Sequence, residues 1–541
     1  MRCDIEGWQQ DFIERLARAD LPAPQSRHSN LNDSDLFALF HSQVLSRFID
    51  IESRRLQRQG KSFYTIGSAG HEGNAAVAAA LRVTDPAFLH YRSGAFFLQR
   101  AKQLEGSNSL YDLMLSFCAS SEDPISGGRH KVLGSLALNI PPQTSTIASH
   151  LPKAMGTAYA IGLSKRLKQA GQWPDDAIVL CNFGDASANH STAVGALNAT
   201  GWSAYQGMPM PILYVCEDNG IGISTSTPRG WTAHQLQNYP AIRYYYADGA
   251  NVSETYAVAR QAAEYIRRTR KPAILHLKTQ RFFGHAGADA EVAYRSNESI
   301  EQSFETDVLL QSAAQVIERE LCTGIQLSEK AQCWLQRIRR VGTEASARPR
   351  LECAESVMAS IVPKTLADDT QPLTSTQQQA VFAFDKRNFK KPQPLGKMIN
   401  WALHEILARY QNTVVFGEDV GKKGGVYHVT HHLFDHFGAN RVVNTLLDEQ
   451  SILGLAMGMA QQGFLPIPEI QFLAYVHNAE DQIRGEAATL PFFSNGQYHN
   501  GMVIRIAGLA YQKGFGGHFH NDNSFAVFRD IPGVIVMCPS N

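Results

Sequence analysis

Two polar residues stand where neighbouring apolar segments end, and they carry the strongest chemical signal in the chain. Asp185 follows one segment in Gly184-Asp185-Ala186, and Asn219 follows the next. The segments read as strands around a helix, so we expect a parallel βαβ unit whose strands end at one sheet edge. Carboxylate and amide oxygens suit Mg²⁺, which usually keeps phosphate oxygens as partners. The helix start near Asn189 suits an anion. The pattern predicts a metal-held diphosphate, although an ordinary βαβ unit with polar strand ends also fits it.

The composition is that of an ordinary globular protein. The 541 residues are 44% hydrophobic and 18% charged, and Lys+Arg and Asp+Glu each total 50. This balance provides no basic field for nucleic acid and no polybasic membrane patch. No apolar run reaches the roughly 18 residues that a transmembrane helix needs. The composition therefore excludes nucleic acid and membrane as expected partners.

The cysteines point to a reducing compartment. The eight cysteines are scattered, and none forms a CxxC or another metal-binding spacing. Cys181 and Cys216 lie inside apolar strand segments, where a buried free thiol is normal. We therefore expect a cytoplasmic protein without a disulfide framework.

The pattern along the chain predicts an α/β fold with two parallel-sheet domains. Residues 1–60 read as an N-terminal helical arm, and 61–300 alternate strands with amphipathic helices. Residues 301–363 have helical spacing, 364–394 have linker composition, and a second α/β pattern fills 395–541.

Seven strands and one tightly packed helix are expected within these domains. The helix is 453–463, which is rich in small residues. The strands are 177–183, 211–217, 273–278, 413–420, 441–445, 502–508 and 533–538.

The segment around Asp185 resembles the thiamine diphosphate motif, in which Gly-Asp-Gly is followed some thirty residues later by Asn. Two positions depart from it, because Ala186 replaces a Gly and Asp218 replaces the first Asn. The resemblance implies that Gly184 and Ala186 border the cofactor. It also implies that Asp185, the Asn219 side chain and the Ile221 carbonyl bind Mg²⁺. Ala186 is a mild change if its backbone has ordinary dihedral angles.

Both halves resemble the fused α and β chains of the thiamine diphosphate-dependent 2-oxoacid dehydrogenases, most closely the branched-chain type. The likeness covers about 40–361 and 395–541, which implies two thiamine-diphosphate-binding-type domains. The family's β chain continues into a C-terminal domain that this sequence lacks, so we expect a fragment or a naturally short protein.

The resemblance also implies a reaction and partners. The reaction is oxidative decarboxylation of a 2-oxo acid with thiamine diphosphate and Mg²⁺. The acyl group would pass to the lipoyl group of a dihydrolipoyl acyltransferase. In the family, the α-type and β-type regions that share a cofactor come from different units, which implies a homodimer of fused chains.

Several residues of the α-type half match functional positions of the family. Tyr91 and Arg92 fall at the diphosphate, where a planar guanidinium fork is suited to the anion. Ile147 matches the bulky residue that holds the cofactor bent. His285, in RFFGHAGADAEVAYR, matches an active-site histidine, and Arg281 matches an arginine on the diphosphate side.

A potassium site is the least secure implication of the resemblance. Ser145, Ser149 and His150 fall where branched-chain relatives bind a structural K⁺. His150 replaces an amide side chain there, which leaves open whether the ion binds or the histidine faces the active site.

Three residues match the β-type half. Glu449 falls at the glutamate that contacts N1′ of the aminopyrimidine, and Tyr475 at the aromatic residue stacked on that ring. His520 matches the β-chain active-site histidine, with His518 as a rival in the same Gly-rich turn.

Two other functions remain open from the sequence. One is a transketolase-like thiamine enzyme, and the other is a truncated, non-catalytic assembly partner. The sequence also leaves the substrate open between a branched-chain 2-oxo acid such as 2-oxoisovalerate and pyruvate.

Overall fold

A computed structural model describes residues 5–24, 31–63, 66–287, 289–362, 372–509 and 516–539. By their contacts these residues belong to two units. The first unit falls within Met1–Ala148, Asp176–Val357 and Phe492–Tyr498. The second falls within Ser149–Asp175, Met358–Pro491 and His499–Asn541. Both are described separately below. The domain boundaries expected from the sequence stay predictions.

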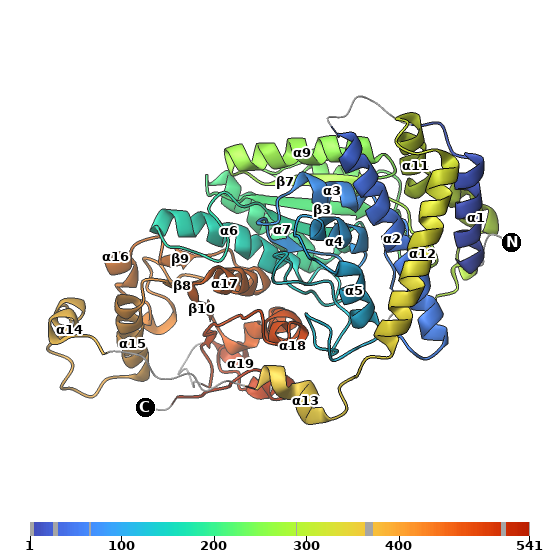
Figure 1. Cartoon of the computed structure of the whole chain (residues 1–541). Coiled ribbons are helices and arrows are strands. Elements are labelled where there is room, and N and C mark those ends of the chain that lie inside the picture. Colours follow the sequence, from blue (N-terminus) through green and yellow to red (C-terminus); the bar gives the residue numbers. More distant parts are fainter. Residues whose placement is uncertain are drawn as a thin grey trace. The chain divides into compact units, whose positions relative to one another are not determined.

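A five-stranded parallel sheet forms the centre of the first unit (Figure 1). Its order is β1 (Ala87–Phe88), β2 (Val179–Gly184), β3 (Ile212–Asp218), β7 (Ala273–Lys278) and β6 (Arg243–Asp248). Strands β2 and β3 are buried along their whole length, which is why they read as continuous apolar runs. Three strands of this sheet were expected from the sequence, and all three are confirmed within two residues.

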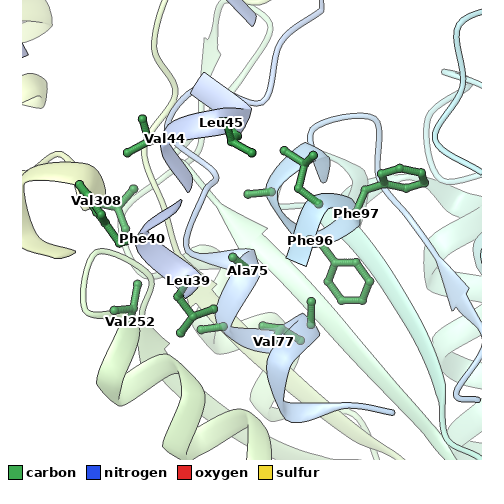
Figure 2. Packing of buried hydrophobic residues seen from close by; sticks show 14 of the residues in the cluster. Leu39, Phe40, Val44, Leu45, Ala75, Val77, Phe96, Phe97, Val252 and Val308 are labelled. Carbon is green, nitrogen blue, oxygen red and sulfur yellow. The ribbon is translucent and has the colours of Figure 1, made fainter. Parts of the chain in front are cut away.

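Helices cover this sheet and enclose the main core. Residues from α2 (Asp33–Arg58), α3 (Asn74–Ala80), α4 (Gly94–Ala101), α9 (Val252–Thr269) and α11 (Val308–Glu318) meet there (Figure 2). Helix α9 packs on β6 and β7. The remaining elements are α1 (Ile5–Arg18), α5 (Ser109–Phe117), η1 (Ser187–Asn189), α7 (Ser191–Tyr205), β4 (Ile221–Gly222), β5 (Thr225–Ser226), α8 (Trp231–Gln237), η2 (Glu291–Ala293), α10 (Asn297–Glu305), α12 (Gly324–Ser346) and α13 (Ala354–Met358).

The second unit contains a four-stranded parallel sheet. Its order is β11 (Arg505–Ile506), β10 (Leu465–Ile470), β8 (Thr413–Gly417) and β9 (Val442–Asn444). The other elements are α6 (Leu151–Leu167), η3 (Ala359–Ile361), α14 (Ser375–Val381), α15 (Leu395–Arg409), η4 (Val426–His428), α16 (Leu433–Phe437), α17 (Glu449–Gln462), η5 (Leu473–Asn478), the π-helix η6 (Gln482–Ala487), α19 (Gly517–His520) and η7 (Phe525–Asp530). The residues of α18 (Leu490–Phe493) are divided between the two units.

Helices α6 and α17 approach each other closely through glycines. A Cβ added to Gly454 would lie 2.2 Å from the Cβ of Pro152, and one on Gly458 would lie 2.0 Å from the Thr157 nitrogen. Only glycine fits at such distances. The predicted helix of small residues is therefore confirmed, and so is its close packing.

Three expectations for the second unit need correction. Residues 533–538 form no strand, and the Ile535 and Met537 side chains are 70% and 81% exposed. A strand needs a neighbour that supplies backbone partners, and the described sheet offers this segment none. The predicted strand 502–508 shortens to β11, and β10 was missed because its prolines weaken the strand pattern. The linker contains α14. Among the described residues, no helix is long and apolar enough to cross a membrane.

Candidate active site

Asp185 lies at the carboxyl edge of the first sheet, next to the end of β3. Gly184 pairs with Glu217 in register, so the two strands end side by side. The Asp185 carboxylate is buried and accepts a hydrogen bond from the Thr227 hydroxyl. Burial raises the pKa of Asp185, and the charge of Asp218 adds to this, although Thr227 and the Asn219 backbone N–H oppose it.

The surroundings of Asp185 are those of a carboxylate that lacks a cation. Within the described part of the chain, no Lys, Arg or His side chain forms an ion pair with it. A buried carboxylate in this state gains from a metal ion. No group of three or more His, Cys, Asp or Glu among the described residues could hold a metal. A magnesium ion at this position would therefore be bound by the Asp185 carboxylate, by amide or carbonyl oxygens and by phosphate oxygens of a bound small molecule. Magnesium commonly takes such a set of oxygen ligands in proteins.

Ala186 has ordinary backbone dihedral angles, as the sequence argument required. Its φ and ψ are −64° and −36°. The space for its methyl group exists because the facing residue is Gly222, where an added Cβ would lie only 2.5 Å from the Ala186 Cβ. The departure from the motif at 186 is thus accommodated by a glycine at 222.

Asn219 is held in a hydrogen-bonded turn. Its Oδ1 accepts from the Ile221 N–H at 3.1 Å, and its Nδ2 contacts His71 Nε2 at 3.1 Å. His71 Nδ1 in turn lies 2.7 Å from Glu217 Oε2. The side chains of His71 and Glu217 are fully buried. Both ends of the amide are therefore positioned by neighbours.

An open pocket of about 340 Å³ adjoins the Asp185 turn and the start of the following helix. It is lined by Ala186, Asn189, Gly222, Thr225, Ser226, Thr227, Pro228 and Trp231. The Trp231 indole N–H donates to Asn189 Oδ1 at 2.7 Å, which ties the pocket wall to η1. Helix α7 begins at Ser191, two residues beyond the start expected from the sequence.

Arg92 and His285 lie together in the first unit. Arg92 Nη2 donates to the His285 carbonyl at 2.9 Å and lies 3.2 Å from His285 Nδ1, while Nη1 donates to the Gly67 carbonyl at 2.7 Å. The Tyr91 ring meets the His285 ring edge to face at 6.5 Å. Burial lowers the pKa of His285, and the charges of Arg92 and Arg281 lower it further. These surroundings favour the neutral form of His285.

Arg281 connects the loop that contains His285 to the turn that follows Asn219. Its Nη1 donates to the Ile223 carbonyl, two residues after Ile221, and its Nη2 donates to the Tyr294 hydroxyl, both at 2.7 Å. Asp289 accepts from the Tyr294 hydroxyl and from the His285 N–H. The fold thus brings together the sequence-predicted residues Tyr91, Arg92, Arg281 and His285.

Glu449 is the first residue of α17 in the second unit. Its Oε2 accepts from Asn478 Nδ2 at 2.8 Å. A second glutamate, Glu418, directly follows β8, and burial together with the charge of Glu449 raises the pKa of Glu418 to about 7. Glu449 therefore disfavours the ionised form of Glu418. Glu418 was missed from the sequence, although an acid at the end of a parallel strand was the available signal.

The rings of Phe472, Tyr475 and His520 form one cluster in the second unit. The Phe472 ring meets His520 edge to face at 4.5 Å, and Tyr475 lies 6.3 Å from His520. His520 is half-buried, whereas its rival His518 is exposed. This packing makes His520 the better-held histidine. Phe472 was not singled out from the sequence.

The proposed potassium segment offers a poor fit to that ion. The Ser149 hydroxyl donates to one oxygen of Glu486, and the Lys153 ammonium lies 2.5 Å from the other. Gln482 donates to the Ser149 carbonyl at 3.2 Å. The Ser149 oxygens are thus engaged, and Lys153 already supplies a positive charge. His150 is buried and Ser145 is exposed, while Ile147 is half-buried.

Two family models match the sequence. The "Dehydrogenase E1 component" model matches residues 41–353, and the "Transketolase, pyrimidine binding domain" model matches residues 391–541. The first match contains Asp185, Asn219 and His285, and the second contains Glu449, Tyr475 and His520.

Curated relatives are β subunits of 2-oxoacid dehydrogenases. The chain is 43% identical over 152 residues to the mitochondrial 2-oxoisovalerate dehydrogenase subunit beta of Dictyostelium discoideum, covering 28% of this chain and 40% of the relative. It is 43% identical over 150 residues to the mitochondrial subunit beta 2 of Arabidopsis thaliana, covering 28% and 41%. It is 41% identical over 147 residues to the pyruvate dehydrogenase E1 component subunit beta of Staphylococcus epidermidis, covering 26% and 43%. The chain therefore spans less than half the length of these relatives.

Proposed function

The chain belongs to the dehydrogenase E1 component family, and from this premise we propose that it decarboxylates a 2-oxo acid with thiamine diphosphate and Mg²⁺. The observation that carries the proposal is the buried Asp185 carboxylate, which has no cation partner in the described structure and lies beside Asn219 and an open pocket. A Mg²⁺ ion bound together with thiamine diphosphate would place a positive charge beside this carboxylate.

The chain's own residues divide the work of binding. Asp185, the Asn219 side chain and the Ile221 carbonyl would hold Mg²⁺, and Gly184 and Ala186 would border the diphosphate. Tyr91, Arg92 and Arg281 would face its negative charge, and Ile147 would support the thiazolium ring. These groups act by position and charge.

A second set of residues would act on the rest of the cofactor and on the substrate. Glu449 would hold a proton at N1′ of the aminopyrimidine, and Tyr475 would pack on that ring. His285 and His520 would move protons at the substrate, which the lowered pKa of His285 favours at neutral pH. When bound, thiamine diphosphate supplies the carbon nucleophile and the electron sink for decarboxylation.

The names of the relatives support a 2-oxo acid as the substrate class and leave the particular acid open. Their names include both 2-oxoisovalerate and pyruvate dehydrogenases. We propose a branched-chain 2-oxo acid as the first substrate to test, a lipoyl group of a dihydrolipoyl acyltransferase as the acyl acceptor, and a homodimer as the working form. Cytoplasmic location is proposed from the scattered free cysteines.

The proposal is tested by binding and by turnover. Calorimetry of the full chain with thiamine diphosphate and Mg²⁺ should show metal-dependent binding that Asp185→Ala abolishes. Glu449→Gln should keep binding but lose at least about 10²-fold in 2-oxoacid-dependent reduction of an artificial acceptor. Unchanged affinity in Asp185→Ala would refute the metal site. Comparison of 2-oxoisovalerate with pyruvate as substrates would decide between the two classes.

A further inference from the structure

We propose that Glu217 and His71 form a positioning pair that orients the amide of Asn219, so that its oxygen rather than its nitrogen faces the cation. This inference rests on the proposed function of Asn219 as a metal ligand. It starts from the contacts from Glu217 to His71 at 2.7 Å and from His71 to Asn219 at 3.1 Å.

On the Glu217 side, a backbone N–H determines which groups donate and which accept. The Phe96 N–H donates to Asn74 Oδ1 at 2.9 Å, so the nitrogen of Asn74 must face Glu217. Asn182 also donates through Nδ2 to Glu217 Oε1, at 2.7 Å. The Glu217 carboxylate therefore accepts from both amides.

On the Asn219 side, another backbone N–H fixes the orientation of the amide. The Ile221 N–H donates to Asn219 Oδ1, so Asn219 presents its NH₂ group to His71. A neutral imidazole has one donor and one acceptor nitrogen. His71 therefore accepts at Nε2 and donates from Nδ1 to Glu217. The Glu217 carboxylate therefore accepts from His71 on one side and from Asn74 and Asn182 on the other. Only a side chain that accepts on both oxygens can satisfy all of these donors.

This arrangement matters for the metal because an amide has two nearly identical ends. Asn219 Oδ1 has a second lone pair beyond the one used by the Ile221 N–H, and it is the atom suited to Mg²⁺. A turned amide would instead direct an NH₂ group at the cation. Partners of this outer kind typically contribute 10- to 100-fold to metal affinity.

Replacing Glu217 by Gln tests this directly. The new amide can accept from Asn74 and Asn182 through its oxygen and donate to His71 Nδ1 through its nitrogen. His71 would then carry its hydrogen on Nε2, which faces the NH₂ group of Asn219. Because Asn219 is half-buried and its neighbours are fully buried, the conflict should displace Asn219.

We expect Glu217→Gln to weaken Mg²⁺ binding roughly 10- to 100-fold in calorimetric titrations of the full chain with saturating thiamine diphosphate. The matched background is Asn219→Asp. An aspartate has no NH₂ group to turn toward the cation, so Glu217→Gln should weaken Mg²⁺ binding less in that background than in the parent chain. Equal weakening in both backgrounds, or no change in either, would overturn the positioning role.

A readout without the cofactor separates this inference from the proposed function. In the ¹⁵N-histidine-labelled chain, NMR should show His71 with its hydrogen on Nδ1, and on Nε2 in Glu217→Gln. The His71 signal is assigned by its loss in His71→Gln. This variant also tests the proposal if Glu217→Gln does not fold. The glutamine amide at position 71 can present either its oxygen or its nitrogen to Asn219, so His71→Gln should weaken Mg²⁺ binding. An unchanged tautomer in Glu217→Gln would refute the pair, whereas absence of Mg²⁺ binding by the parent chain would refute only the proposed function.

Discussion

The methyl group of Ala186 occupies the space that a side chain at Gly222 would need. A Cβ added at 222 would lie 2.5 Å from the Ala186 Cβ, which is closer than two non-bonded carbon atoms can approach. The residue that departs from the thiamine motif and the glycine that faces it therefore form a complementary pair across the Asp185 turn.

We predict that Gly222→Ala destabilises the chain by about 1–3 kcal/mol, as overpacking usually does. Adding Ala186→Gly to that variant should recover most of the loss, because it removes the facing methyl group. Urea unfolding of the parent, both single variants and the double variant measures the coupling. Strictly additive effects would show that the two positions do not share this space.

His404 is a second residue whose surroundings give a testable consequence. It is fully buried on α15, its Nδ1 bonds to the Asn400 carbonyl at 2.9 Å, and its ring packs against those of Phe384, His436 and Phe437. Burial, together with the charges of His436, Lys397 and His432, lowers the pKa of His404 to about 4, although the hydrogen bond to the Asn400 carbonyl opposes this shift.

We predict that His404 lowers the free energy of unfolding as the pH falls below neutral. Its folded pKa lies below the unfolded value of about 6.5, so between these values the unfolded chain binds the extra proton and stability falls as the pH falls. The loss should be roughly 2 kcal/mol between pH 7.5 and pH 5. His404→Phe should remove this part of the slope in denaturant unfolding, whereas His499→Phe, at an exposed position, should keep it. An equal slope in both variants would contradict the assignment.

Sequence reasoning succeeded where neighbouring residues carry the signal. Asp185 and Asn219 were found because each directly follows a buried strand, and the parallel register then places them at one edge. His71, Glu217 and Phe472 were missed, since their importance depends on contacts with residues distant in the sequence. A polar residue inside a buried strand, as Glu217 is in β3, was the one available hint.

Helix α6 and the π-helix η6 are joined by a buried ion pair. The Lys153 ammonium and the Glu486 carboxylate are each 1% exposed and lie 2.5 Å apart. A π-helix is rare and frequently marks a functional position. In this case it places Glu486 where the hydroxyl of Ser149 and the ammonium of Lys153 both reach the carboxylate.

We predict that Lys153→Met lowers the free energy of unfolding by about 3–5 kcal/mol, because it leaves the Glu486 carboxylate buried without its charge partner. Lys153→Met combined with Glu486→Gln should recover part of the loss. The melting temperature of the parent chain should be equal in KCl and NaCl at the same concentration, since Lys153 provides the charge internally. Stabilisation by potassium alone would show that the ion binds after all.

At the element level, the strand pattern was reliable only where a partner strand exists. The strands 177–183, 211–217 and 273–278 are confirmed because each has neighbours in the sheet. The equally apolar segment 533–538 has none among the described strands, and it stays outside the sheet with Ile535 and Met537 exposed. Hydrophobicity predicts which residues could form a strand, but pairing decides whether they do.

The two units interleave in sequence at the level of the whole molecule. Residues 149–175, which include α6, belong by contacts to the second unit although their sequence neighbours on both sides belong to the first. The glycines that join α6 to α17 hold them there. No local pattern predicts this, because it depends on which distant helix offers a matching surface.

The proposed residues are also divided between the units. Asp185, Asn219 and His285 lie in the first unit, whereas Glu449 and His520 lie in the second. If the homodimer follows the family arrangement, each site takes its diphosphate-binding residues from one copy and its pyrimidine-binding residues from the other copy. Inactive variants with defects in different groups should then complement each other.

We predict that mixing Asp185→Ala chains with Glu449→Gln chains restores activity. With free subunit exchange, half of the dimers would be mixed, and each mixed dimer would contain one intact site and one doubly defective site. The mixture should therefore reach roughly a quarter of parental activity, if association is a closed two-fold dimer. Sedimentation of the mixture confirms the dimer, and a mixture of Asp185→Ala with Asn219→Ala chains is the control that should stay inactive. If each copy instead used its own two groups, every site in a mixed dimer would contain one defect and the first mixture would also stay inactive.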